Sequence, residues 1–160
     1  MTNDQRSTHV SPVPSVGYLA VAFIAGVLAV LVFHQGMLGF LHAIEVTPAV
    51  PYETRPTAPL GVPQIWSLAF WGGIWGIIFA YLEPHLRRGW AYFLGALLFG
   101  AIAPTLVAWF VVLPLKGLPI AGGWRASGIA TGLLVNGAWG IGTALFLWGG
   151  AVIAGFRRPI

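Results

Sequence analysis

The chain has 160 residues, of which 58% are apolar and only 8% are charged, and its mean hydropathy is +0.83. Soluble domains carry about 25% charged residues, so this composition excludes an ordinary soluble enzyme and indicates several membrane spans. The net charge of +4 comes from Lys and Arg residues scattered between the apolar runs, which argues against nucleic-acid binding. Without cysteine, the chain has no disulfides, thiolate metal sites or cysteine nucleophiles.

The first part of the chain predicts a polar tail followed by a long membrane helix. Residues 1–16 are polar and interrupted by proline, and we expect a flexible cytoplasmic tail. The apolar run 17–44 is too long for a signal-peptide core and should be retained as a helix. Its roughly 28 residues would reach about 42 Å, against ~30 Å for the hydrocarbon core, so one end should protrude. His42 and Glu45 lie at that end.

Residues 46–62 form a proline-rich loop whose prolines prevent a regular helix. Three further spans are expected at 63–82, 90–113 and 128–156, the third kinked at Pro104, and 157–160 is a cytoplasmic end. The chain is therefore predicted to be all-α, a polytopic membrane protein with a four-helix transmembrane bundle. The distribution of arginine favours both termini in the cytoplasm and the proline-rich loop outside.

Two segments of similar sequence indicate that a helical hairpin was duplicated. Residues 72–77 (GGIWGI) and 136–141 (NGAWGI) agree at Gly, Trp, Gly and Ile, and both enter the membrane from the same side. Small residues four positions apart also mark helix faces that approach closely in membranes. The expected helix-packing residues are Gly72, Gly76, Gly128, Gly132 and Gly140.

Few polar side chains lie at membrane depth, and four form a candidate intramembrane polar site: His34, Gln35, Thr105 and Asn136. Three of them lie about 12–15 Å from the outer end of their spans and can meet. One interpretation is structural, with hydrogen bonds that fix helix register. The other is functional, with His42 and Glu45 on a shared face as an external entry for protons or a small cation. The turn around Glu83 is expected to be a solvated cluster of ion pairs.

No cofactor is predicted. A bis-histidine haem needs two deep imidazoles on different helices, and only His34 is deep, although a quinone or a single-ligand pigment stays open. His42, Glu45 and Glu53 lack the spacing of metal ligands, so no metal site is expected. Fingerprints of nucleotide-binding loops and hydrolases are also missing from the sequence.

Three stretches, 32–36 (VFHQG), 59–63 (PLGVP) and 68–76 (LAFWGGIWG), resemble those of an uncharacterised family of small four-span bacterial inner-membrane proteins. The resemblance implies a bacterial inner membrane and brings no activity. The expected partners are the lipid bilayer and either further copies of the chain or a larger membrane complex. The leading hypothesis is a non-enzymatic accessory, assembly or scaffold subunit. The alternative is a small-solute or proton-coupled transporter or channel that uses His34, Thr105 and Asn136, and a membrane-embedded enzyme ranks third.

Overall fold

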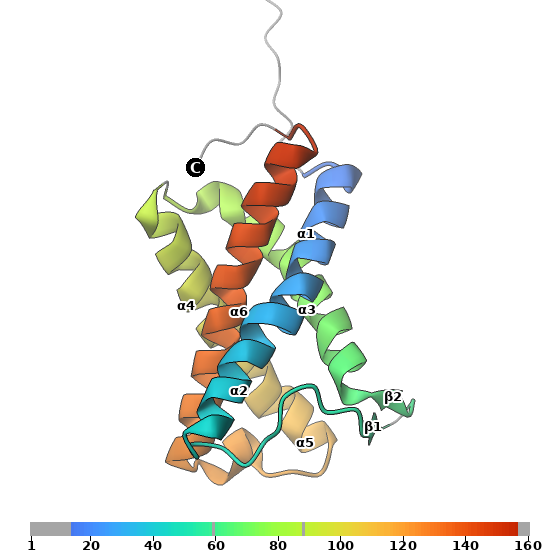
Figure 1. Ribbon diagram of the computed structural model, residues 1–160, viewed down its shortest axis with the longest axis vertical. Helices are drawn as coiled ribbons and strands as arrows, with labels where there is room; N and C mark the ends of the chain where they lie inside the picture. The colour runs from blue at the N-terminus through green and yellow to red at the C-terminus, as the bar shows by residue number, and fades with distance from the viewer. Residues whose placement is uncertain (1–13, 59, 88, 157–160) are drawn as a thin grey trace, which may run out of the picture.

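The computed structural model describes residues 14–58, 60–87 and 89–156 and forms a bundle of long helices (Figure 1). In this part of the chain, four helices are long and apolar enough to cross a membrane: Val16–Ala43, Gln64–His85, Trp90–Leu115 and Ala126–Ile153. The predicted all-α class and the number of long apolar helices are therefore confirmed. The expected tail 1–16 and end 157–160 lie almost entirely outside the described residues.

The first long helix contains a π-helical turn in its middle. It consists of α1 (Val16–Ala29), the π-helical segment η1 (Val30–His34) and α2 (Gln35–Ala43). Ser15 caps its start, because the Ser15 hydroxyl accepts a hydrogen bond from the Tyr18 backbone N–H at 3.3 Å. A π turn inserts one extra residue into the helix and is often found at functional sites.

The proline-rich loop ends in a small hairpin that the sequence did not predict. Strands β1 (Pro56–Thr57) and β2 (Val62–Pro63) pair in antiparallel register, with Thr57 opposite Val62. The Thr57 hydroxyl donates to the Val62 carbonyl at 2.8 Å and holds this turn closed. Helix α3 (Gln64–Leu82) begins directly after the hairpin and continues into the short 3-10 segment η2 (Glu83–His85).

The second half of the chain contains the remaining two long helices. Helix α4 (Trp90–Val107) includes the buried Pro104 and is followed by a second π-helical segment, η3 (Ala108–Val112), and by α5 (Leu113–Leu115). Helix α4 continues through Pro104, where the kink was expected, and the π-helical turn begins only at Ala108. A 3-10 segment, η4 (Ile120–Gly123), leads into α6 (Ala126–Ile153), which ends before Gly155 at φ 74°.

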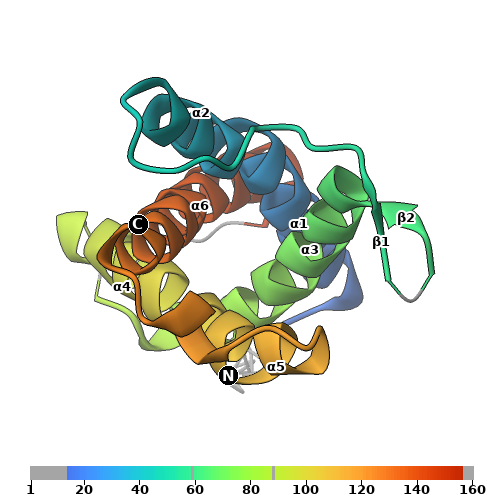
Figure 2. The same cartoon turned by 90° about the horizontal axis from the view of Figure 1, so that it is seen from below.

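The bundle is built from two tightly packed helix pairs, α1 with α3 and α4 with α6, joined where α1 meets α6. Figure 2 shows this arrangement end-on, and Figure 1 shows that α1 begins and α6 ends at the same end of the molecule. Helices α3 and α4 scarcely touch through their backbones. Aromatic rings fill the space between them: Phe79 and Phe99 have centroids 5.5 Å apart, and Trp75 lies 5.9 Å from Phe99.

Glycine lets the paired helices approach to backbone contact. A Cβ atom added at Gly76 would lie 3.2 Å from the Gly26 Cα, and one added at Gly140 would lie 3.1 Å from the Gly100 Cα, with a carbonyl oxygen closer still in each case. Real Cβ atoms are rarely that close to a neighbour, so neither position has room for a side chain. A Cβ atom added at Gly72 would meet the Val30 side chain first and would lie 3.0 Å from the Gly26 carbonyl oxygen.

One expected packing residue lies outside these contacts. A Cβ atom added at Gly128 would meet nothing within 4 Å, whereas one at Gly132 would lie 3.3 Å from the Trp109 indole nitrogen. Crossing helices stay in contact for only a few turns, and in α6 the contact with α4 does not extend to the second residue after Ala126. Gly128 is therefore not a packing residue within the described chain.

Candidate functional site

The Asn136 side-chain amide forms a hydrogen bond across the α4–α6 interface. Its Nδ2 donates to the Thr105 hydroxyl at 2.8 Å, and Thr105 donates to the Gly132 carbonyl at 3.2 Å. Thr105 is only 1% exposed. The three groups form a continuous chain of hydrogen bonds, which holds α4 and α6 in one register.

His34 and Gln35 form a second polar cluster, at the junction of η1 and α2. Gln35 is 2% exposed, and its Oε1 accepts a hydrogen bond from the Tyr52 backbone N–H at 2.7 Å. Its Nε2 lies 3.3 Å from the His34 Nδ1. The Tyr52 hydroxyl donates to the Leu31 carbonyl, within the π-helical turn, at 2.8 Å. The proline-rich loop is therefore fastened to the first long helix through Tyr52.

The predicted polar site thus consists of two separate clusters. Among the described residues, no hydrogen bond joins His34 or Gln35 to Thr105 or Asn136. The reason is the orientation of α6, which presents different residues to its two neighbours. Val135 packs with the α2 residues Leu38 and Leu41, and a Cβ at Gly142 would touch Phe33. The neighbouring positions Asn136 and Gly140 instead face α4.

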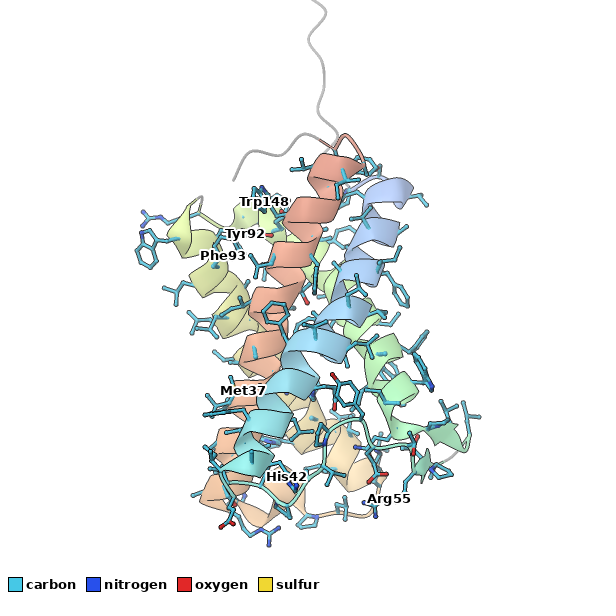
Figure 3. The ribbon with its side chains drawn as sticks, viewed as in Figure 1. Met37, His42, Arg55, Tyr92, Phe93 and Trp148 are labelled. Atoms are coloured by element: carbon cyan, nitrogen blue, oxygen red, sulfur yellow. The ribbon has the colours of Figure 1, made fainter. Side chains whose placement is uncertain are left out.

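His42 and Glu45 lie at the exposed end of the first long helix, where the sequence placed them. His42 Nδ1 is 3.2 Å from the Thr47 carbonyl, and Glu45 has the left-handed φ of 60° at the turn into the loop. Figure 3 shows His42 and Arg55 at this end of the bundle and Tyr92 at the opposite end. No group of three His, Asp or Glu side chains that could hold a metal occurs in residues 14–58, 60–87 and 89–156.

Glu83 has partners beyond the turn in which it was expected to form solvated ion pairs. Its carboxylate accepts hydrogen bonds from the Tyr18 hydroxyl and, at 3.3 Å, from the Tyr92 hydroxyl. Both tyrosines are buried, one at the start of α1 and one at the start of α4. Glu83 therefore ties the end of α3 to two other helices. The signal that was available in the sequence was a tyrosine at the start of each of two spans.

Glu53 and Arg55 form an ion pair in the proline-rich loop, with Arg55 Nη2 2.6 Å from Glu53 Oε2. The hydrogen bonds from the Arg55 side chain and backbone hold the pKa of the Glu53 carboxyl below its usual range. Arg55 is well exposed, so this pair contributes little to the stability of the bundle. Its effect is local, on the shape of the loop beside β1.

Comparison of the chain with protein-family models, curated proteins and solved structures gives no significant match. The resemblance to small bacterial inner-membrane proteins therefore stays a prediction. What the described polar groups can do chemically follows from their geometry alone. Asn136 with Thr105, Gln35 with Tyr52, and Glu83 with two tyrosines each join separate segments, as expected of groups that fix an assembly.

Proposed function

We propose that this chain is a four-span integral protein of a bacterial inner membrane and that its bundle serves as a non-enzymatic accessory, assembly or scaffold subunit. The observation that carries the proposal is the use of the interior for helix packing. Gly26, Gly76, Gly100 and Gly140 bring backbones into contact, and aromatic rings fill the remaining gap. A rigid, tightly packed core suits a protein that presents its outer surface to partners.

The outer surface supports this proposal because large apolar side chains cover it along the helices. Helix α4, for example, exposes Leu94, Leu98, Ile102 and Leu106, which are spaced four residues apart and form one stripe. Such a stripe requires contact with lipid tails or with another apolar helix. The expected partners are therefore the bilayer and either further copies of this chain or another membrane protein.

The proposed topology places both termini in the cytoplasm. Arg87 lies in the turn between α3 and α4, at the end of the bundle where α1 begins, and the positive-inside rule assigns that end to the cytoplasm. A reporter active only in the cytoplasm should give a signal when fused after Ile160. A reporter inserted beside Arg55 should behave as external. The opposite pattern would reverse the assignment.

Duplication of a helical hairpin is the proposed origin of the fold, and equivalent contacts support it. Gly76 packs on Ala22 and Gly26 in the first helix pair, and Gly140 packs on Ala96 and Gly100 in the second. The spacing from Ala22 to Gly26 recurs in the second pair, and so do Tyr18, as Tyr92, and Trp75, as Trp139. The two pairs would then be related by an axis along the membrane normal.

A small-solute or proton-coupled transporter is the second candidate. The observation in its favour is the presence of the His34 imidazole and the Asn136 amide within two apolar helices, since such groups are costly in a membrane and often functional. This function predicts that His34→Ala impairs flux in proteoliposomes while leaving the bundle folded. Absence of proton or solute flux in the unmodified protein, under imposed gradients, would refute it.

Cysteine cross-linking in native membranes tests the scaffold proposal, because the chain has no cysteine of its own. Single cysteines would be placed at Leu94, Leu98 and Ile102 on the exposed stripe of α4, with the fully buried Ala96 as the matched control. A homo-oligomer that uses this face gives disulfide-linked dimers at the exposed positions and none at Ala96. Native mass measurement in mild detergent covers the other faces and other partners. A strictly monomeric particle without a stoichiometric partner would refute the proposal.

A further inference from the structure

The hydrogen bonds around Gln35 fix the protonation state of His34. The Tyr52 backbone N–H can only donate, so the Gln35 atom that faces it at 2.7 Å is the amide oxygen. The other end of the same amide, Nε2, can only donate, and it faces the His34 Nδ1 at 3.3 Å. His34 Nδ1 is therefore an acceptor, which means that the imidazole is neutral and carries its proton on Nε2.

Protonation of His34 is incompatible with this arrangement. A proton on Nδ1 would place an N–H group opposite the N–H2 group of Gln35. Rotation of the amide by half a turn restores a hydrogen bond to His34, but it places the N–H2 group opposite the Tyr52 N–H. Because Gln35 is 2% exposed, water cannot readily replace the lost acceptor. When His34 is charged, the Gln35 amide can therefore form a hydrogen bond with His34 or with the Tyr52 N–H, but not with both at once.

We infer that His34, Gln35 and Tyr52 form a proton-linked latch, in which proton binding at His34 releases the proline-rich loop from the first long helix. Tyr52 is the fastening point, through its N–H to Gln35 and its hydroxyl to Leu31. Its backbone has φ 55°, a conformation that costs a non-glycine residue energy and persists only while the surroundings hold it. Loss of the Gln35 bond removes part of that support.

The position of Tyr52 determines what its release from Gln35 would change in the structure. The loop runs from the end of α2 along the outside of the first long helix to β1 and the start of α3 (Figures 1 and 2). Tyr52 joins it to the carbonyl of Leu31, inside the π-helical turn. Release of Tyr52 therefore frees the loop and removes a hydrogen bond from that turn, whatever partner the bundle binds.

Other ionisable groups near His34 are few. Helix α6 carries none between Ala126 and Ile153, and those of α1, α3 and α4 are tyrosines, each at the helix end away from the loop. On its own helix His34 is followed by His42, which contacts the Thr47 carbonyl in the same loop. Glu45 lies at the turn into the loop, and the loop itself carries Tyr52 and the paired Glu53 and Arg55. His42 is thus the other histidine in contact with the loop, and it serves as the control.

A spin label on the loop tests the latch. Val50→Cys supplies the single cysteine, at a side chain that is exposed and two residues from Tyr52. The labelled protein in nanodiscs is measured by EPR at pH 8 and pH 3.5. The mobile-to-immobile ratio should rise roughly threefold to tenfold at pH 3.5, the factor expected for loss of the one hydrogen bond between Gln35 and Tyr52. An unchanged ratio overturns the proposal.

Substitutions identify which side chain produces the pH response of the loop. His34→Leu should keep the loop immobile at both pH values, and Gln35→Leu should leave it mobile at both. His42→Leu is the matched control and should respond to pH like the unmodified protein. If His34→Leu does not fold, His34→Asn replaces it, since the Asn side chain is polar but does not titrate. A response that disappears with His42→Leu and persists without His34 overturns the proposal.

Discussion

Replacement of Gly140 by alanine tests whether backbone contact between α4 and α6 holds the second helix pair together. A Cβ atom there would lie 3.0 Å from the Ala96 carbonyl carbon and nearer to its oxygen, while ordinary contact begins at 3.4 Å. The two backbones must therefore separate by more than about 0.4 Å, because the Ala96 carbonyl oxygen is closer than the carbon and no flexible side chain can absorb the change. Overpacking of this kind costs about 1–3 kcal/mol.

The intrinsic preference of alanine for helices works in the opposite direction, and Gly128→Ala measures it in the same helix. Alanine is favoured over glycine by up to about 1 kcal/mol. A Cβ at Gly128 meets nothing within 4 Å, so its substitution reports helix propensity without a clash. We expect Gly128→Ala to be neutral or stabilising by up to about 1 kcal/mol. Gly140→Ala should be less stable than Gly128→Ala by about 1–3 kcal/mol.

Reversible unfolding in mixed micelles, with increasing mole fraction of a denaturing detergent and helicity as the signal, gives both free energies. The difference between the two variants isolates the clash, because propensity and detergent effects are shared. If Gly140→Ala is as stable as Gly128→Ala, the helices are not in backbone contact at Gly140. The second helix pair would then not depend on backbone contact at this position.

Three further predictions concern the polar contacts. Asn136→Ala should lower the melting temperature in detergent slightly, because it removes a hydrogen bond of a kind worth about 0.6 kcal/mol. Asn136→Leu should lower the melting temperature more, because the larger side chain also separates the helices. Equal melting temperatures would contradict the position of Asn136 in the interface. Tyr92→Phe should destabilise the native protein but have a smaller effect in the Glu83→Gln variant, since a hydrogen bond to a charged acceptor is worth about 1.5–3 kcal/mol. Additive losses of stability in this double-mutant cycle would contradict an interaction between Tyr92 and Glu83. Arg55→Gln should raise the pKa of Glu53 toward its usual value in a carboxyl NMR titration, because the lowered pKa depends on Arg55. The stability that this pair contributes is present above the unfolded-state pKa of Glu53 and is lost as the pH falls through its folded-state pKa.

The sequence predicted the features that depend on local composition. Runs of apolar residues set the four long helices, and the prolines between 46 and 62 set the loop, because hydrophobic length and missing N–H groups act within a few residues. Glycines four apart also indicated Gly72, Gly76 and Gly140 as contact positions. Gly128 fits the same spacing but lies beyond the contact, since spacing identifies a helix face and not the turn at which a neighbouring helix departs.

The polar contacts could not be predicted in the same way, because they depend on the rotation of each helix about its own axis. Depth along the span placed His34 and Asn136 at comparable levels, yet successive residues of a helix differ by 100° in direction. Val135 and Asn136 are neighbours in the chain, and one meets α2 while the other meets α4. A depth argument therefore identifies polar residues that can meet, and only the orientation of α6 decides which ones do.

The contacts of Tyr52 and Glu83 could not be predicted for a second reason, because each residue lies in a segment whose composition is typical of a solvated loop or turn. Tyr52 lies among prolines and charges, and Glu83 begins a turn rich in His and Arg. In both cases the group is fixed by a buried partner at a distant position, Gln35 for Tyr52 and Tyr18 for Glu83. The partners were visible as polar atoms inside apolar helices, which must find hydrogen bonds once the helices are packed. A glutamine beside a histidine inside an apolar helix thus predicts that another segment must supply a hydrogen bond. The sequence does not say which loop residue supplies it.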